Sequence, residues 1–259
     1  MKKPAVKTTD PWESLKEFTA ARIAMGRVGS SIPLTEYLKF KLAHAHARDA
    51  VYSELNSEAL MYYLKHLDIP ILKLHSKAEN RHQYLQRPDL GRLPSDQSTD
   101  TIKEHTGKYD ISIIIADGLS AHAVNSNAVQ LVEGLVQLFR SVKYKLAPIC
   151  LTSQSRVALA DHIAHGLNAR LSIMLIGERP GLSSADSVGA YLTYNPKPGL
   201  TDESRNCVSN IRPEGLTHNL AAEKIFYLVQ EAFRRKLSGV NLKDDAGLLN
   251  QPNSDLLSP

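Results

Sequence analysis

The sequence predicts an α/β fold in which a Rossmann-like parallel sheet carries helices on both faces and follows a mainly helical N-terminal lobe. Three short apolar runs have the length and the branched side chains of buried strands, and a helical pattern follows each run. Strands that alternate with helices are typical of a parallel sheet buried on both faces. The runs are 109–116, 145–151 and 170–176, and the helical patterns are 120–142, 155–168 and 217–237.

Changes in composition divide the chain into four parts. Residues 1–20 are rich in lysine and threonine and hold two prolines, so we expect a flexible arm there. Residues 21–107 should form the helical lobe and 108–243 the Rossmann-like domain. The polar residues 244–259 should form a flexible tail.

The arm contains one helix signal, the stretch DPWESLKEF at 10–18. Asp10 is suited to be its N-cap, with a proline at the first helical position. Trp12, Leu15 and Phe18 then lie near one face of the helix. We expect this face to pack on the body of the protein rather than to act as a docking handle.

The lobe should contain a long helix over 34–55, with Thr35 as its N-cap. His44 and His46 in this stretch are two residues apart and cannot share a helix face, so the pair is not expected to bind a metal. The stretch 84–94 is rich in turn residues, and its prolines and glycine should end any helix.

Two details of the larger domain bear on its elements. Pro148 lies inside the second apolar run, which either weakens this strand or places it at a sheet edge. Ser120 precedes the helical pattern 120–142 and is suited to be its N-cap. Residues 239–242 are a candidate for a last short strand.

The segment 176–216 follows the third strand and carries five glycines, four prolines and three arginines. Connections this long are uncommon in compact domains unless they are functional or disordered. Tyr191, Tyr194 and Ile211 occur among the turn residues, which argues against disorder. We therefore predict an ordered, polar segment that builds a site at the carboxyl end of a strand.

Charge and cysteine content limit the possible partners. The chain has 259 residues, a net charge of +4 and only two cysteines, so neither a disulfide framework nor a cysteine metal cluster is expected. The positive charges are scattered, which argues against nucleic acid as a partner. The apolar runs are too short to span a membrane and the N-terminus lacks a signal sequence, so we expect a cytoplasmic protein.

Familiar catalytic motifs do not occur in the sequence. A dinucleotide site needs three spaced glycines between a strand and a helix, but the stretch ADGLSAHAV at 116–124 has one. A Walker A sequence and a serine-hydrolase elbow do not occur either, so a nucleophilic role for Ser120 is disfavoured. His162 and His165 share a helix face without an acidic partner, which favours a solvated surface.

Glu178 and Cys207 are the most informative polar residues. Glu178 stands two residues beyond the third strand, where a carboxylate either accepts hydrogen bonds from a ligand or pairs with Arg179 or Arg205. Cys207 lies among arginine and asparagine residues. A thiol in a folded protein is usually structural. The donors beside this one favour a polar ligand.

Long stretches of the chain resemble one known family, the small (light) subunit of ethanolamine ammonia-lyase. The resemblance covers about 20–244, and strings of this length in the same order are far more specific than any short motif. It rests on ARIAMGRVGSSIPLTEYLKFKLAHAHARDAV, YLQRPDLGR, IIIADGLSAHAV, SRVALADHI, IGERPGLSSADSVGAYLTYNPKPG and DESRNCVSNIRPEGL.

The resemblance implies a carbon–nitrogen lyase that converts ethanolamine to acetaldehyde and ammonia with adenosylcobalamin (coenzyme B12). It implies that the TIM-barrel large subunit binds ethanolamine and performs the chemistry, and that cobalamin lies between the two subunits. The small subunit then supplies no catalytic residue and no metal ligand. The cofactor-binding positions of the family match Val157, Glu178 and Cys207 in this sequence.

Further expectations accompany this resemblance. Arg156, Arg205 and Asn206 are candidates to meet the amides and the phosphate of the cofactor. Members of the family often occupy the ethanolamine-utilisation bacterial microcompartment, and the arm is a candidate to address the enzyme there. Two alternatives remain open: an independent nucleotide-binding α/β protein such as a dehydrogenase, and a structural adaptor that adds nothing to cofactor affinity.

Overall fold

The structure, a computed structural model, describes residues 10–244 and centres on one six-stranded sheet. The strands are β1 (Ile71–His75), β2 (Tyr109–Ala116), β3 (Ile149–Ser153), β4 (Ala169–Gly177), β5 (Val188–Tyr194) and β6 (Asn206–Ile211). Their order across the sheet is β1-β3-β2-β4-β5-β6. The first four strands are parallel, and β5 and β6 run antiparallel to their neighbours.

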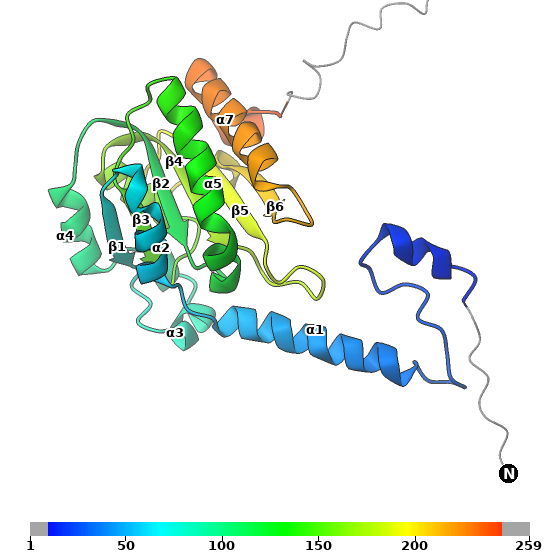
Figure 1. Cartoon of the computed structure of the whole chain (residues 1–259). Helices are drawn as coiled ribbons and strands as arrows, with labels where there is room; N and C mark the ends of the chain where they lie inside the picture. The colour runs from blue at the N-terminus through cyan, green and yellow to red at the C-terminus, as the bar shows by residue number, and fades with distance from the viewer. Residues whose placement is uncertain (1–9, 245–259) are drawn as a thin grey trace, which may run out of the picture.

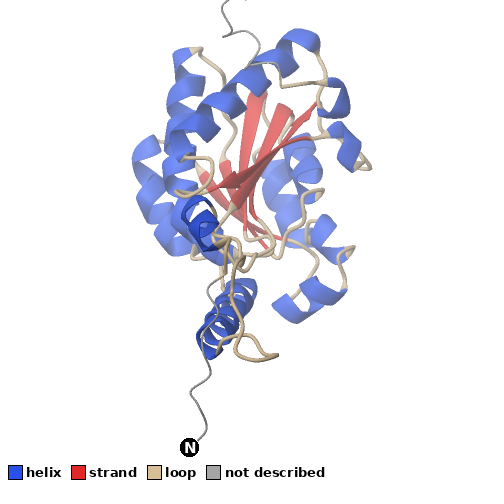
Figure 2. Ribbon diagram, turned by 90° about the vertical axis from the view of Figure 1, so that its right-hand side faces the viewer, coloured by secondary structure: helices blue, strands red, loops and turns tan. Residues whose placement is uncertain are grey.

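Helices cover both faces of this sheet, as predicted (Figure 2). On one face lie α2 (Ser57–Leu64), α5 (Ala121–Ser141) and α7 (His218–Arg235). On the other face lie α4 (Asp96–Glu104) and α6 (Leu159–Gly166). The α/β class and the helical N-terminal region are therefore confirmed. None of the helices within residues 10–244 combines the length and the apolar character needed to span a membrane.

Strand β2 shows how the sequence builds the two cores. Successive side chains of a strand point to opposite faces, so Ile113 and Ile115 pack in the core under α5 whereas Ile114 packs under α6. All three are buried. Ser120 caps α5 by accepting a hydrogen bond from the Ala123 N–H at 3.1 Å, which confirms its predicted role.

The segment 176–216 contains the two antiparallel strands β5 and β6, which the sequence analysis did not predict. In the register of these strands, Tyr191 lies opposite Met174 of β4 and Cys207 of β6. A β-bulge interrupts the pairing between Val188 and Ala190. The segment is thus ordered, as expected, because it extends the sheet.

The N-terminal region adds a strand as well as helices. It holds α1 (Leu34–Tyr52), α2, α3 (Arg81–Gln86) and α4, and strand β1 pairs with β3 inside the same sheet. Figure 1 shows α1 projecting from the body of the protein. Because β1 lies outside β3, the prediction that Pro148 places this strand at an edge is wrong: the proline precedes the first residue of β3.

Three local predictions also need correction. Helix α1 begins at Leu34 after Pro33 and has no side-chain cap, so Thr35 is not its N-cap. Residues Gly239–Asn241 form a 3₁₀ helix instead of a strand. A 3₁₀ helix covers Glu13–Phe18. The side chains of Phe18 and of Trp12, directly before this helix, are exposed, so their predicted packing on the body is wrong. The arm before residue 10 and the tail after residue 244 lie outside the described residues.

Candidate functional site

A groove with a cavity of ≈ 700 Å³ lies at the carboxyl end of the parallel strands. Five parts of the chain form it: the turn before α4, the connection from β3 to α6, helix α6 itself, strand β5 and the loop before β6. Its lining residues are Pro88, Arg92, Leu93, Arg156, Val157, Ala158, His162, Tyr191, Gly199, Leu200, Thr201 and Asp202.

Val157 lies in the connection between β3 and α6 and lines the groove. Its half-buried side chain packs with Tyr191 against the core under α6. The Arg156 N–H donates to the Gly91 carbonyl at 2.8 Å, which fixes the approach to Val157. Gly91 is required here, because a Cβ on it would lie 2.9 Å from the Cγ of Arg156.

Asp117 fixes the connection between β3 and α6 through hydrogen bonds. It follows β2, is buried, and accepts hydrogen bonds from the N–H groups of Gln154 at 2.7 Å and Ser155 at 3.0 Å. Arg81 lies 3.5 Å from its carboxylate. Burial raises the pKa of Asp117, although the backbone donors and Arg81 oppose that rise. The carboxyl group thereby ties the end of β2 to the groove.

Glu178 stands directly after β4 and reaches across to Asn210, near the end of strand β6. Its N–H donates to the Ser187 carbonyl at 3.1 Å, and its Oε2 accepts from the Asn210 N–H at 3.2 Å. The sequence left open an ion pair of Glu178 with Arg179 or Arg205. Among the ion pairs of the described residues neither occurs, and Arg205 pairs with Asp161 and Asp202 instead.

Cys207 lies on β6 with an exposed thiol. Partial burial raises the pKa of this thiol, the Tyr191 hydroxyl opposes the rise through a hydrogen bond, and the charge of Glu178 adds to it. The thiol is therefore protonated at neutral pH. It suits packing or hydrogen bonding better than nucleophilic attack, because the thiolate is the reactive form.

Tyr191 joins these residues, and the sequence analysis did not identify it as a site residue. Burial, then the neighbouring Cys207, and then the charge of Glu178 raise its pKa to about 12. Val157 and Tyr191 line the groove, and Glu178 and Cys207 lie beside Tyr191. The structure thus brings the three predicted positions around one aromatic ring. The alternating pattern GAYLTY at 189–194 was the available signal for a strand here.

Of the three other residues suggested to meet a ligand, only Arg156 lines the groove. Its Nη2 donates to the Tyr84 carbonyl at 3.1 Å, and its Nε is buried without a partner. Arg205 is buried against Asp161. Asn206 is occupied by backbone groups of Gly239 and Leu242.

The two histidines of α6 differ in their exposure. His162 lines the groove, and burial lowers its pKa, whereas His165 is exposed. The predicted solvated surface therefore holds for His165 alone.

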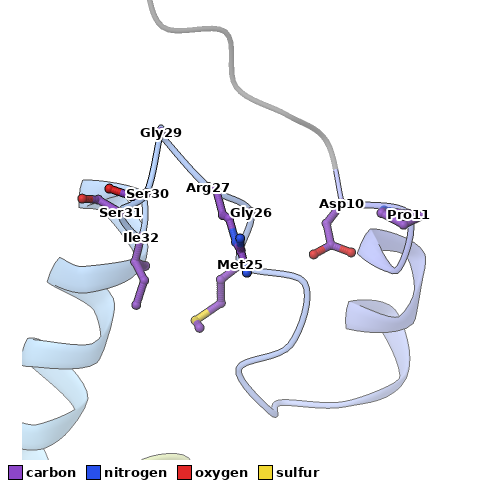
Figure 3. A pocket seen from close by; sticks show the side chains of 9 residues that line it. All are labelled: Asp10, Pro11, Met25, Gly26, Arg27, Gly29, Ser30, Ser31 and Ile32. Carbon is purple, nitrogen blue, oxygen red and sulfur yellow. The ribbon is translucent and has the colours of Figure 1, made fainter.

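A second cavity, of ≈ 680 Å³, lies between Asp10 and the turn before α1 (Figure 3). It contains none of the predicted site residues. Within the described part of the chain, no three His, Cys, Asp or Glu side chains gather as a metal site would require.

Comparison with known proteins gives consistent results. Residues 9–243 match the model of the family described as ethanolamine ammonia-lyase light chain. The chain is 50% identical over 250 residues to a Pseudomonas fluorescens protein named ethanolamine ammonia-lyase small subunit, covering 95% of this chain and 91% of that protein. Proteins of the same name from Ralstonia nicotianae, 50% identical over 247 residues (94% and 92%), and Azotobacter vinelandii, 49% identical over 243 residues (92% and 90%), are similar throughout.

Proposed function

Because this chain belongs to the ethanolamine ammonia-lyase light-chain family, we propose that it is the small subunit of an adenosylcobalamin-dependent lyase that converts ethanolamine to acetaldehyde and ammonia. A small subunit requires a large subunit as its partner, and the lyase is active as the complex of both. In this proposal the large subunit binds ethanolamine, and this chain contributes one wall of the cofactor site.

The groove at the carboxyl edge of the sheet is the observation that carries this proposal. A corrin ring is broad and mainly apolar, and it bears side-chain amides and a phosphate-containing loop. The groove offers an apolar floor in Val157 and Tyr191. Arg156 also lines the groove, and its Nε is buried without a protein partner, which suits a ligand that has hydrogen-bond acceptors. These residues fit the proposed group.

Each residue has a role that follows from its chemistry. Val157 packs against the apolar part of the cofactor. The carboxylate of Glu178 has one oxygen on the Asn210 N–H and accepts from a cofactor amide with its remaining capacity. The neutral thiol of Cys207 packs or donates weakly, and Arg156 meets an amide oxygen or the phosphate.

Bound adenosylcobalamin supplies radical chemistry through homolysis of its cobalt–carbon bond. The part of this chain is to orient the cofactor and to exclude water from one side of it. A closed wall matters because reactive species must be kept from solvent. Tyr191, whose hydroxyl stays protonated at neutral pH, contributes shape and a neutral hydrogen bond to that wall.

The proposal extends to location in the cell. We place the enzyme in the cytoplasm, inside the ethanolamine-utilisation microcompartment that family members often occupy. The exposed Trp12 and Phe18 side chains near the N-terminus support this, because they are suited to recognition by a shell component. Deleting residues 1–20 should release the enzyme from isolated microcompartments while the activity of the purified complex stays unchanged.

The decisive experiment measures acetaldehyde release from ethanolamine with adenosylcobalamin. This chain and its large subunit are assayed separately and then mixed. Activity that requires the mixture supports the proposal. Full activity of the large subunit alone, with unchanged cofactor affinity, would reduce this chain to an adaptor. A cofactor-loaded complex without activity would contradict the proposed reaction.

A further inference from the structure

Two arginines, Arg92 and Arg156, line the groove from backbone segments that are joined to each other. Arg92 is the last residue of the short 3₁₀ helix Leu90–Arg92. The carbonyl of its neighbour Gly91 accepts the Arg156 N–H at 2.8 Å. Among the ion pairs formed within residues 10–244, neither Arg92 nor Arg156 occurs. The groove therefore receives two guanidinium groups that no carboxylate of the described chain pairs.

The Arg156 guanidinium is held by Tyr84 and keeps one buried donor unused. Its Cζ lies 4.2 Å from the centre of the Tyr84 ring, and its Nη2 donates to the Tyr84 carbonyl at 3.1 Å. Tyr84 is fully buried, and its hydroxyl donates to the Ser155 carbonyl at 3.1 Å. The Nε of Arg156 is buried without a hydrogen-bond partner. Since buried polar atoms are rarely unsatisfied, this donor indicates an acceptor that the chain itself does not supply.

The start of helix α6 adds backbone donors to the same wall of the groove. Val157 and Ala158 directly precede the first residue of α6, and both line the groove. No side chain caps this helix, and the N–H groups of Val157 and Ala158 donate to no acceptor within the part of the chain that the structure describes. Free N–H groups at the start of a helix favour an anion. They therefore add to the effect of the two arginines.

The acidic residues at this edge of the sheet do not neutralise the two arginines. Asp202 also lines the groove, but its carboxylate accepts from Arg205 at 3.0 Å. Glu178 reaches Asn210 of β6 instead of an arginine. Three further carboxylates have cations of their own: Asp161 pairs with Arg205, Asp89 with Arg87 and Asp117 with Arg81. This wall of the groove is therefore suited to an anion that has several oxygen acceptors.

We propose that Arg92, Arg156 and the start of α6 form a subsite for a phosphate diester, the one in the nucleotide loop of the cofactor. Guanidinium groups bind phosphate oxygens in a fixed planar geometry. Cobinamide is the same corrin without the nucleotide loop, so the subsite makes the complex select cobalamin over cobinamide. This inference rests on the proposed function, since it requires the cofactor to occupy the groove.

The test compares ligands with and without the phosphate in the complex of the full chain and the large subunit. Dissociation constants for adenosylcobalamin and adenosylcobinamide are measured by equilibrium dialysis. The variants are Arg92→Gln and Arg156→Lys, the second of which keeps the charge and loses the planar fork. The matched control is Arg87→Gln, which removes a cation from the same turn outside the groove. Thermal unfolding of Arg92→Gln should stay within about 2 °C of the wild type, because Arg92 is exposed.

The expected result is a loss of affinity that is confined to the ligand with the phosphate. Adenosylcobalamin should bind about fivefold more weakly to Arg92→Gln and about 20-fold more weakly to Arg156→Lys. Adenosylcobinamide binding should change by less than about twofold in both variants, and Arg87→Gln should change neither ligand by more than about twofold. A general disturbance of the groove would weaken both ligands alike, so the comparison within each variant isolates the phosphate.

Three results would contradict these proposals. Equal losses for both ligands, or no loss in either variant, would overturn the inference. The isolated chain is also titrated with inorganic phosphate by calorimetry. Phosphate binding that Arg92→Gln abolishes, with an unchanged ratio of the two corrin affinities, would assign the subsite to a free anion and would also overturn the inference. A wild-type complex that binds neither corrin would instead contradict the proposed function.

Discussion

Arg205 and Asp161 form a buried ion pair that joins the loop before β6 to helix α6. Their side chains are 2% and 1% exposed. The same guanidinium donates to the Leu200 carbonyl at 3.1 Å and to Asp202 at 3.0 Å, and both of these residues line the groove. Arg205 thus positions one rim of the groove without facing it.

Replacing Arg205 by Met should destabilise the chain by about 3–5 kcal/mol, because Asp161 is left as a buried charge without its partner. The double variant Arg205→Met, Asp161→Asn should recover a large part of that loss. Urea unfolding of the wild type, the single variant and the double variant measures the loss in the free energy of unfolding for each variant. Equal losses in the single and double variants would show that the unpaired charge of Asp161 does not cause the destabilisation.

Glu178→Ala should weaken adenosylcobalamin binding to the complex about tenfold, because one charged acceptor of the proposed site is lost. Filling the space beside Tyr191 with Cys207→Trp should weaken it as well. The isolated chain should stay folded in both cases. The control is Glu223→Ala on an exposed position of α7. Wild-type cofactor affinity in both site variants would remove Glu178 and Cys207 from the site.

Alkylation of the isolated chain by iodoacetamide should occur at Cys207 and depend strongly on pH. Since the pKa of this thiol is raised, its thiolate fraction at pH 8 is below that of an ordinary cysteine, and the rate should keep rising above the usual thiol range. Glu178→Gln removes a nearby negative charge, lowers the pKa and should accelerate the reaction at pH 8. Mass spectrometry follows the label.

Cys207→Ser provides the control for this measurement. The remaining thiol, Cys150, is buried, and burial raises its pKa to about 12, so the folded variant should take up almost no label. An unchanged rate in Glu178→Gln would mean that the carboxylate does not influence the thiol.

Gly118→Ala should prevent stable folding or lower the free energy of unfolding by about 3 kcal/mol or more. Gly118 has a φ of +55°, and a Cβ there would lie 2.3 Å from the carbonyl oxygen of Gly177. Neither backbone segment has room to move, because a Cβ on Gly177 would lie 2.0 Å from the Ser120 carbonyl oxygen.

Gly134→Ala is the matched comparison for Gly118→Ala. Gly134 lies within α5, and its added Cβ would meet the Ala222 Cβ at 3.3 Å. Alanine favours helix by about 1 kcal/mol over glycine, which offsets the tight contact. A denaturation midpoint near wild type is expected for Gly134→Ala, and similar losses in both variants would contradict the geometric argument.

The sequence predicted the parts of the fold that have long, uniform patterns. Strand β2 matches its predicted limits because 109–116 (YDISIIIA) carries four isoleucines and no glycine or proline. Strand β1 was missed because it has five residues and includes Lys73. Strands β5 and β6 were missed because glycines and turn residues interrupt them, and their pairing depends on a partner far along the chain.

The site was predictable only in part for the same reason. Val157, Glu178 and Cys207 were named from the resemblance to a family, and their role in binding remains a prediction. Tyr191 is opposite Cys207 only through the register of β5 and β6, which no local pattern encodes. The exclusion of Arg205 from the groove follows from its partner Asp161, 44 positions away in the chain.

Arg81 restrains the orientation of α1 relative to the sheet. Arg81 donates from Nε to the Val51 carbonyl at 2.6 Å and from Nη1 to the Gly118 carbonyl at 2.8 Å, beside its ion pair with Asp117. The joint between the projecting helix and the sheet edge is therefore locked in the free chain. Because the joint is already ordered, α1 loses little orientational entropy when it packs against another surface, and this preorganisation favours association. The distance from the helix to Glu178 is then set by folding, before any encounter.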